Sequence, residues 1–347
     1  MTKLDDPPTA AGTKDVAGRR EGRNWRNLSR LLTPERIEDL ALLCVLVALG
    51  AYFSARSPYF LYADNLSNLL LAVSVIGTMA AISTLVLVAG YLDLSVGSAA
   101  AFSAIACVWL IEDHGWGTAA AILTALLLGT VVGSLNGVFS VALGVNPIIT
   151  TIGMLSVLRG LAYVMTEGSE ILVNDEFLLD LGSGRFLSLP YGVWVMFVTF
   201  VLVALFARYT VAGRNLYAIG ANPRASRLAG IAIGRYQVVV LAASGLSAAV
   251  GGLLLISQAG SAASHAATGY ELQVVTAVLL GGTALTGGSG RIRGTFLAVL
   301  IIGTLNNGMT LLAVPSYYQT VASGVLLLAA VGVAQARQRL RRSGATK

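Results

Sequence analysis

The chain has 347 residues, of which 56% are hydrophobic and only 12% are charged. Soluble domains carry about 25% charged residues, so this composition excludes a protein whose whole surface faces water. Apolar runs of about 18 or more residues recur along the chain, and each can cross the hydrocarbon layer of a membrane as a helix. The runs do not alternate with a period of two, which disfavours a transmembrane β-barrel and predicts an all-α membrane protein.

In chain order, the apolar runs and the residues that break them predict ten transmembrane helices. They follow a basic segment, 1–36, which we expect to be a retained cytoplasmic tail and not a cleaved signal peptide. The helices are expected at 37–55, 66–89, 94–111, 116–143, 147–165, 190–207, 236–258, 271–285, 294–314 and 317–335. They form one transmembrane domain, 37–335, and a second basic cytoplasmic tail, 336–347, follows it.

Lysine and arginine are distributed unevenly between the connecting segments. If both chain ends are cytoplasmic, 20 of the 23 basic residues lie in cytoplasmic segments. The exceptions are Arg56, Arg185 and Arg159, the last of which lies inside the fifth helix. Because basic residues concentrate on the cytoplasmic side of membrane proteins, this distribution favours an even number of helices with both ends inside. The net charge of +6 is then a signal of topology, and no nucleic-acid partner is expected.

The two longest connections differ in charge. The outer one, 166–189, is acidic, whereas the inner one, 209–235, is basic. Each is either a solvated connection or a docking surface, the outer one for a soluble substrate carrier and the inner one for a cytoplasmic partner.

A short internal similarity connects the two halves of the chain. The sequence Gly-Ser-Leu-Asn-Gly at 133–137 resembles Gly-Thr-Leu-Asn-Asn-Gly at 303–308, at an offset of 170 residues. The fourth and ninth helices run in opposite directions, so the similarity favours inverted repeats formed by helices 2–5 and 7–10, as in many transporters. A match this short in glycine-rich sequence also arises by chance, and both interpretations stay open.

The sequence lacks the parts of an ATPase or a hydrolytic enzyme. It contains no Gly-Lys pair and therefore no P-loop. His114 and His265 are the only histidines, and both lie in or near outer connections. Cys44 and Cys107 lie inside apolar runs, where thiols behave as small hydrophobes. We therefore expect no catalytic residues, no metal and no cofactor.

Ionisable side chains at membrane depth are costly, which makes them candidates for a functional role. Asp93 and Arg159 lie within the apolar region, and Glu271 lies at a helix boundary. For Asp93 we favour a role as N-terminal cap of the third helix over direct contact with a substrate. Arg159 forms either a structural ion pair or part of a solute pathway. All three are candidate pathway or gate residues, but so few carboxylates argue against a transporter driven by a proton or sodium gradient.

Small and amide residues mark two of the predicted helices. Glycines recur at every fourth position of the fourth helix, at Gly129, Gly133 and Gly137. Such a stripe allows another helix to approach closely. Asn136 lies beside the stripe, and Asn306 and Asn307 hold the matching place in the ninth helix. These amides either connect helices, which is the commoner case, or hydrogen-bond a polar solute, so we add them to the candidate pathway residues.

The inner connection contains the signals of a short helix at 223–229. An asparagine suits the N-cap, a proline the first helical position and a glycine the C-terminal end. The segment comprises Asn222, Pro223, Arg224, Ala225, Arg227, Leu228, Ala229 and Gly230. Because a helix this short is not stable alone, we interpret it as a lever that presses into a soluble partner.

Five ordered motifs resemble the permease subunits of bacterial ABC importers for monosaccharides of the ribose, xylose and arabinose type. The motifs are Gly-Tyr-Leu-Asp-Leu-Ser-Val-Gly at 90–97, Leu-Asn-Gly at 135–137, the segments 151–160 and 217–231, and Glu271 with the glycines at 281–288. The similarity covers nearly the whole chain after the basic tail. The long tail itself, Ala221 in place of a common second glycine, and the outer connection depart from the pattern and leave the sugar open.

This resemblance implies a fold like that of type II ABC importers in the bacterial inner membrane. It also implies three protein partners: a second permease subunit, identical or not, a cytoplasmic ATPase and a periplasmic or lipid-anchored sugar-binding protein. Membrane lipid surrounds such a subunit. The short inner helix corresponds to the coupling helix that fits a groove of the ATPase. Alternatives are a permease of the same class for nucleosides, branched-chain amino acids or a signalling furanose, and a gradient-driven secondary transporter.

Overall fold

The computed structural model describes residues 34–344, and within them the side chains of 36–335. Residues 1–33 of the predicted N-terminal tail and residues 345–347 lie outside the described residues. The helices are α2 (Pro34–Arg56), α3 (Ala63–Val88), α4 (Val96–Glu112), α5 (Thr118–Ala142), α6 (Pro147–Thr166), α7 (Glu176–Ser183), α8 (Tyr191–Tyr209), α9 (Val211–Ala221), α10 (Pro223–Leu228), α11 (Ile233–Ala259), α12 (Tyr270–Leu280), α13 (Ile292–Leu311) and α14 (Ser316–Gly344). Two short antiparallel pairs join β1 (Ile171–Leu172) to β4 (Ser261–Ala262) and β2 (Arg185–Phe186) to β3 (Leu189–Pro190).

Eight of these helices are long and apolar enough to cross a membrane, within the part of the chain that the structure describes: α2, α3, α5, α6, α8, α11, α13 and α14. The all-α membrane architecture is therefore confirmed. The predicted count of about ten depends on α4 and α12, which have only 17 and 11 residues. At 1.5 Å per residue, α12 is about 16 Å long, far less than the roughly 30 Å of a hydrocarbon layer.

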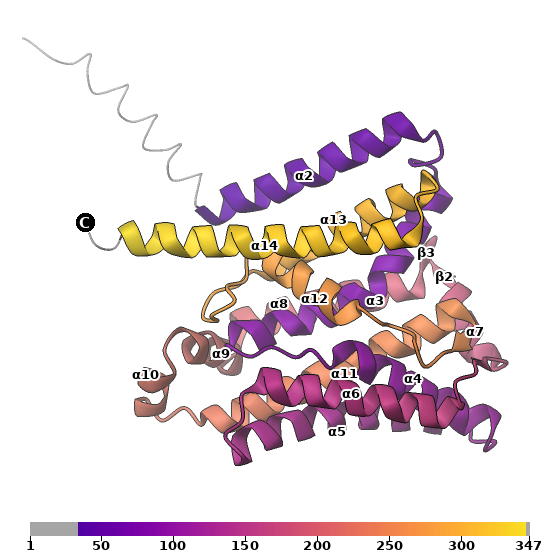
Figure 1. The fold of residues 1–347 in the computed structure, drawn as a ribbon, viewed down its shortest axis with the longest axis horizontal. Coiled ribbons are helices and arrows are strands. Elements are labelled where there is room, and N and C mark those ends of the chain that lie inside the picture. The colour runs from indigo at the N-terminus through magenta and orange to yellow at the C-terminus, as the bar shows by residue number, and fades with distance from the viewer. Residues whose placement is uncertain (1–33, 345–347) are drawn as a thin grey trace, which may run out of the picture.

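Non-helical segments precede both short helices and carry the chain into the bundle. Residues 90–95 lead into α4, and residues 260–269 lead into α12. Figure 1 shows the two segments entering from opposite ends of the bundle, the first from the end that carries α10 and the second from the end that carries α7. Residues 90–93, the short break between the second and third expected helices, are thus the start of a buried extended segment, with Asp93 and Ser95 nearly inaccessible to solvent.

The helix pairing repeats between the two halves of the chain. In the first half α4 packs on α5, on α6 and on the central helix α11. In the second half α12 packs in the same way on α13, on α14 and on the central helix α3. The segments before α4 and α12 also enter the bundle from opposite ends. Inverted repeats of helices 2–5 and 7–10 predict both features.

The acidic connection after α6 folds against the bundle and does not form a loose loop. Asp175 caps α7, because its carboxylate accepts the Leu178 N–H at 3.0 Å, and it also accepts the Thr118 hydroxyl at 2.5 Å. Glu112 accepts two hydrogen bonds from Asn174. Leu178 is fully buried. Several acidic side chains near this connection therefore hold the segment in place, a role that their charge alone did not indicate.

Helix boundaries differ from the expected ones where tertiary structure intervenes. Helix α12 ends at Leu280, before the predicted residue 285, because Gly282 turns the chain with φ +93°. Helix α14 continues to Gly344, beyond the predicted end at 335. Helix α9 occupies a stretch in which only a connection was expected. Figure 1 shows that α2 begins and α14 ends at the end of the bundle where α10 lies.

Candidate translocation and coupling sites

Helix α10 is built by the local signals that predicted it. The Asn222 side chain accepts the Ala225 N–H at 3.0 Å, and Pro223 occupies the first helical position. The helix ends at Leu228, one residue before the predicted end, and Ala229 is its C-cap. Gly230 follows with φ +81°, a conformation that an L side chain rarely adopts.

Most of α10 projects away from the rest of the chain. Ser226 is its one buried residue, and Arg224, Ala225 and Arg227 are exposed. Leu228 is 91% exposed, more than any other large hydrophobic residue whose exposure is described. In Figure 1 the helix lies at one extremity of the bundle. Helix α10 is thus a short, capped helix with an exposed apolar side chain at its C-terminal end.

Four glycines from three segments meet directly behind α10, and we call this contact the glycine junction: Gly90, Gly220, Gly287 and Gly288. The Gly288 N–H donates to the carbonyl oxygen of Val88 at 2.7 Å. A Cβ at Gly220 would overlap that carbonyl oxygen, and a Cβ at Gly287 would overlap the backbone of Gly90. The end of α9, the end of α3 and the turn between α12 and α13 are therefore in backbone contact, next to the N-cap of α10.

The segment that follows Gly90 leads from the glycine junction to a buried network of polar side chains. Asp93 accepts both the backbone N–H of Ser95 at 2.9 Å and its hydroxyl at 2.6 Å. The Asn136 amide of α5 donates to the same hydroxyl at 2.9 Å. The expected cap needs correction, because the Asp93 carboxylate binds the residue before α4 and not an N–H of the first helical turn. It orders the extended segment that leads into α4.

Arg159 of α6 holds the segment that leads into α12. One terminal nitrogen of its guanidinium donates to the carbonyl oxygens of Ser264 and Ala266, at 2.6 and 2.8 Å. No carboxylate forms an ion pair with Arg159 within the described residues. The structural partner of this arginine is therefore a pair of backbone carbonyls.

Glu271 lies where the two short helices begin. Its Oε1 atom accepts the Gly269 N–H at 3.2 Å, whereas its Oε2 atom is buried without a hydrogen-bond partner in the described chain. A Cβ at Gly97 would overlap this Oε2 atom and the carbonyl oxygen of Ala267. The first turns of α4 and α12 are thus in direct contact, with a carboxylate between them.

The neighbouring amides Asn306 and Asn307 of α13 have different roles. Asn307 exchanges two hydrogen bonds with Asn65 of α3, at 2.9 and 3.1 Å. Asn306 instead lines a cavity, and its Oδ1 atom is buried without a hydrogen-bond partner in the described chain. Asn307 therefore connects two helices, whereas Asn306 lies in the wall of a cavity.

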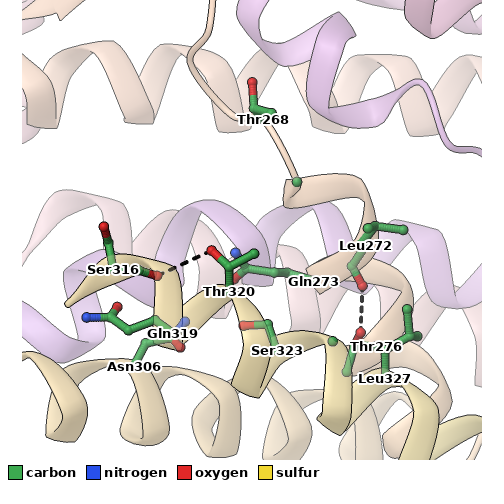
Figure 2. Close-up of a pocket in the computed structure, with 12 residues that line it drawn as sticks. Thr268, Leu272, Gln273, Thr276, Asn306, Ser316, Gln319, Thr320, Ser323 and Leu327 are labelled. Atoms are coloured by element: carbon green, nitrogen blue, oxygen red, sulfur yellow. Dashed lines mark hydrogen bonds between the residues drawn. The ribbon is translucent and has the colours of Figure 1, made fainter. Parts of the chain in front are cut away.

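That cavity lies between α12, α13 and α14 and has a volume of about 380 Å³. Figure 2 shows the side chains that line it, most of them uncharged and polar. The lining residues are Thr268, Gly269, Leu272, Gln273, Thr276, Asn306, Ser316, Gln319, Thr320, Ser323, Gly324 and Leu327. Asn306 was the one cavity residue predicted. A signal for the others existed in α14, where Ser316, Thr320 and Ser323 recur at helical spacing in an otherwise apolar helix.

The glycine stripe of α5 lies against α11. A Cβ at Gly129 would overlap the carbonyl oxygen of Gly245, and a Cβ at Gly133 that of Leu241. A Cβ at Gly137 would meet the backbone of Val238. The two helices therefore pack backbone to backbone along this face.

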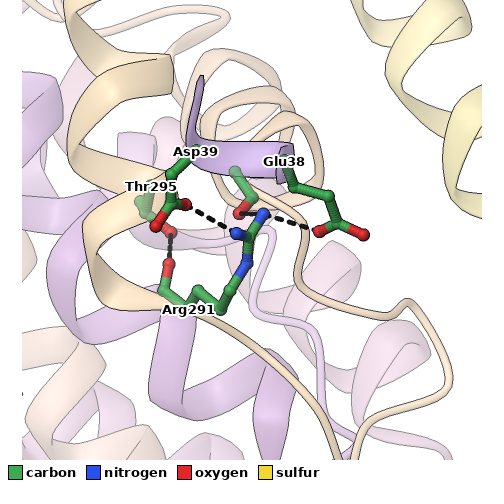
Figure 3. A network of polar contacts seen from close by, with 5 residues as sticks. Glu38, Asp39, Arg291 and Thr295 are labelled. Atoms are coloured by element: carbon green, nitrogen blue, oxygen red, sulfur yellow. Dashed lines mark hydrogen bonds and ion pairs between the residues drawn. The ribbon is translucent and has the colours of Figure 1, made fainter. Parts of the chain in front are cut away.

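An ion-pair cluster joins the first helix to the turn that follows α12. Arg291 contacts Glu38 at 2.7 Å and Asp39 at 2.6 Å, both from α2. Figure 3 shows its guanidinium between the two carboxylates. The Arg291 nitrogen that contacts Glu38 also donates to the carbonyl oxygen of Gly281 at 3.4 Å. Sequence reasoning missed this cluster, because its members are more than 250 residues apart.

No group of three or more His, Cys, Asp or Glu residues suited to a metal ion exists in the described part of the chain. Cys107 is buried and Cys44 is exposed, and neither forms a disulfide.

Comparison with known proteins identifies the transport system. The family described as "Branched-chain amino acid transport system / permease component" matches residues 65–331. The chain belongs to this family. It is 35% identical over 347 residues to the L-arabinose ABC transporter permease protein of Azospirillum brasilense, covering 99% of both chains. It is 38% identical over 313 residues to the ribose import permease protein of Escherichia coli strain K12, covering 89% of this chain and 97% of the relative.

A third relative, the ribose import permease protein of Bacillus subtilis strain 168, is 40% identical over 281 residues, 80% of this chain and 87% of its own. No solved structure matches the chain significantly. Family membership confirms the resemblance drawn from the sequence motifs. The permease is a transport subunit and not an enzyme, it crosses the inner membrane several times, and it works with an ATPase and a substrate-binding protein.

Proposed function

We propose that the permease forms half of the membrane pathway of an ATP-driven importer for a monosaccharide, with α10 as its coupling helix. The observation that carries the proposal is α10 itself, a capped helix that exposes Leu228 at one extremity of the bundle. The relatives named for L-arabinose and ribose support a pentose as the substrate.

The end of the bundle that carries α10 is then the cytoplasmic end. Both α2 and α14 meet this end (Figure 1), which supports cytoplasmic termini. The basic residues Arg208, Arg214, Arg224, Arg227 and Arg235 gather in the connection that includes α10, as expected of a cytoplasmic segment. The folded acidic connection with α7 then faces outward, where the substrate-binding protein docks.

A second permease subunit covers faces that the single chain leaves open. Helices α6 and α14 are the least buried of the long helices that follow α2, and they expose Ile149 and Val164 on α6 and Val325 and Leu328 on α14. In hydrocarbon such residues face either lipid or another helix. Two copies arranged around a central pathway would use part of this surface, and lipid would cover the remainder.

Closure of the ATPases moves the two α10 helices, and the glycine junction carries that motion inward. Gly220 lies at the end of α9, two residues before the N-cap of α10, and contacts the end of α3. The extended segment that holds Asp93 starts at this contact, so displacement of α10 shifts the segment and the start of α4. The chain of Asp93, Ser95 and Asn136 then acts as a gate that responds to the cytoplasmic partner.

The test uses the complete transporter in liposomes, with ATPase and substrate-binding protein, and measures uptake of labelled ribose and L-arabinose. We expect Leu228→Asp to lower uptake at least tenfold and to weaken retention of the ATPase, because a charge replaces the apolar contact. Leu228→Met, which keeps the apolar contact, should transport like the wild type. Normal uptake by Leu228→Asp would show that α10 is not the coupling helix.

The same preparation tests the class of transporter. Uptake that requires ATP and the ATPase subunit supports the proposal, whereas uptake by the permease alone along an ion gradient contradicts it. Competition by unlabelled nucleosides and branched-chain amino acids then determines whether the substrate is a monosaccharide.

A further inference from the structure

The cavity between α12, α13 and α14 has the size and the location of a ligand site. Its volume of about 380 Å³ falls within the roughly 300–1,000 Å³ of small-molecule pockets. Thr268 and Gly269, at the end of the segment that enters from the α7 end, form part of its wall. The cavity therefore lies where that segment reaches the interior of the bundle.

The wall of the cavity carries uncharged groups that can form hydrogen bonds. Amides come from Gln273, Asn306 and Gln319, and hydroxyls come from several serines and threonines, but no lining residue is ionisable. A wall of this kind suits an uncharged molecule with many hydroxyl groups. It offers no counter-charge for the ammonium and carboxylate of an amino acid or for a phosphorylated sugar.

Some of these polar groups already form hydrogen bonds within the protein. The Thr276 hydroxyl donates to the carbonyl oxygen of Leu272 at 2.6 Å, and the Thr320 hydroxyl donates to that of Ser316 at 3.3 Å. The Gln319 amide donates to the carbonyl oxygen of Val314 at 3.2 Å.

Three other polar groups of the wall have no such partner. The side chains of Gln273 and Ser323 form no hydrogen bond within the described chain, and the Oδ1 atom of Asn306 is buried without one. Figure 2 shows Gln273 and Ser323 extending into the same space beside Gln319. Polar groups without partners are costly at membrane depth, which makes those in a cavity wall candidates to bind a polar ligand.

We propose that this cavity holds the monosaccharide during its passage, with sugar hydroxyls hydrogen-bonded to Gln273, Asn306 and Ser323. The site rests on the proposed import function and specifies where the substrate is recognised within the membrane. Gln273 supplies both a donor and an acceptor from α12, Asn306 supplies the amide nitrogen of α13 as a donor, and Ser323 supplies a hydroxyl from α14. Three helices thus contribute to recognition, so relative movement of α12 and α14 would release the sugar.

The experiment measures uptake and ATP hydrolysis together in the reconstituted transporter. We expect Gln273→Leu and Asn306→Val to lower the number of sugars moved per ATP at least tenfold, while stimulated ATPase activity stays within twofold of the wild type. Thr124→Val is the matched control, because Thr124 lies on α5 outside the cavity and its hydroxyl donates to its own helix, to the carbonyl oxygen of Ala120 at 2.8 Å. Its transport ratio should stay within about threefold of the wild type.

The outcomes separate the site from the proposed function. If the wild type imports neither ribose nor L-arabinose, the proposed function fails. If the wild type transports and both variants match its ratio, the cavity is not the site. If uptake and ATPase activity fall in parallel in both variants, the residues are structural and the assignment is equally wrong.

Discussion

Gly133 is the glycine of the α5 stripe that tolerates an added atom least. A Cβ there would overlap the backbone carbonyl group of Leu241 and meet the Cα atom of Ala242, and neither can rotate away as a side chain would. Gly133→Ala must therefore push the two helices apart along a contact that also includes Gly129 and Gly137. Overpacking of this kind costs about 1–3 kcal/mol, and rigid backbone neighbours place it near the upper value.

Alanine also favours a helix over glycine by about 1 kcal/mol, which offsets part of this cost. The net expectation for Gly133→Ala is a loss of about 2 kcal/mol in the free energy of unfolding. Gly153 of α6 supplies the matched control, since a Cβ there meets no atom within 4 Å. Gly153→Ala should leave stability unchanged or raise it by up to about 1 kcal/mol.

Thermal unfolding of the detergent-solubilised transporter, followed by tryptophan fluorescence, measures the difference. A shift of 1 kcal/mol moves the midpoint by about 2–4 °C in chains of 150–250 residues and by less in longer ones, so Gly133→Ala should melt several degrees below Gly153→Ala. Equal midpoints for the two variants, or a higher midpoint for Gly133→Ala, would refute the close packing of α5 on α11.

Two further predictions concern hydrogen bonds that span the bundle. Arg159→Met should leave the carbonyl oxygens of Ser264 and Ala266 unpaired and increase hydrogen–deuterium exchange in 261–269. Arg159→Lys should retain protection, because one nitrogen makes both bonds. Equal exchange in the two variants would contradict this role. Asn65→Leu and Asn307→Leu should each destabilise the protein. A double-mutant cycle should give a coupling energy of about 0.6–1.7 kcal/mol between the two residues. Purely additive changes in the midpoint of thermal unfolding would argue against the amide pair.

Local signals in the sequence were sufficient wherever a neighbour in the chain determines the conformation. The start of α10 follows from Asn222 and Pro223, and the start of α6 follows in the same way from Asn146 and Pro147. In each case the asparagine side chain accepts a nearby backbone N–H, so no tertiary contact is needed. The long apolar helices are similarly predictable, because length and hydropathy decide whether a segment spans the membrane.

Where distant segments determine the structure, sequence reasoning was incomplete. Residues 90–95 contain a Gly-Tyr-Leu-Asp pattern that predicts a turn, but contacts with α5 and with the glycine junction hold the segment extended within the bundle. Arg159 was expected to form either an ion pair or part of a solute pathway, and in the structure it donates to two carbonyl oxygens of a segment more than 100 residues away. Which side chain binds the backbone carbonyls of a non-helical segment depends on the tertiary structure, and no local sequence pattern indicates it.

The weak internal similarity gains meaning from the polar partners of its two asparagines. At the offset of 170 residues, Asn136 of α5 corresponds to Asn306 of α13. Asn136 donates to Ser95, the residue that precedes α4, and Asn306 lies in the wall beside Gly269, the residue that precedes α12. In the first half the entry segment supplies a hydroxyl to the asparagine. In the second half the N-cap of the short helix is a glycine without a hydroxyl, and Asn306 lies in a cavity wall instead. If the two halves are inverted repeats, the cavity marks a place where their symmetry is broken, and a polar substrate that binds there would account for the space that the second half leaves open.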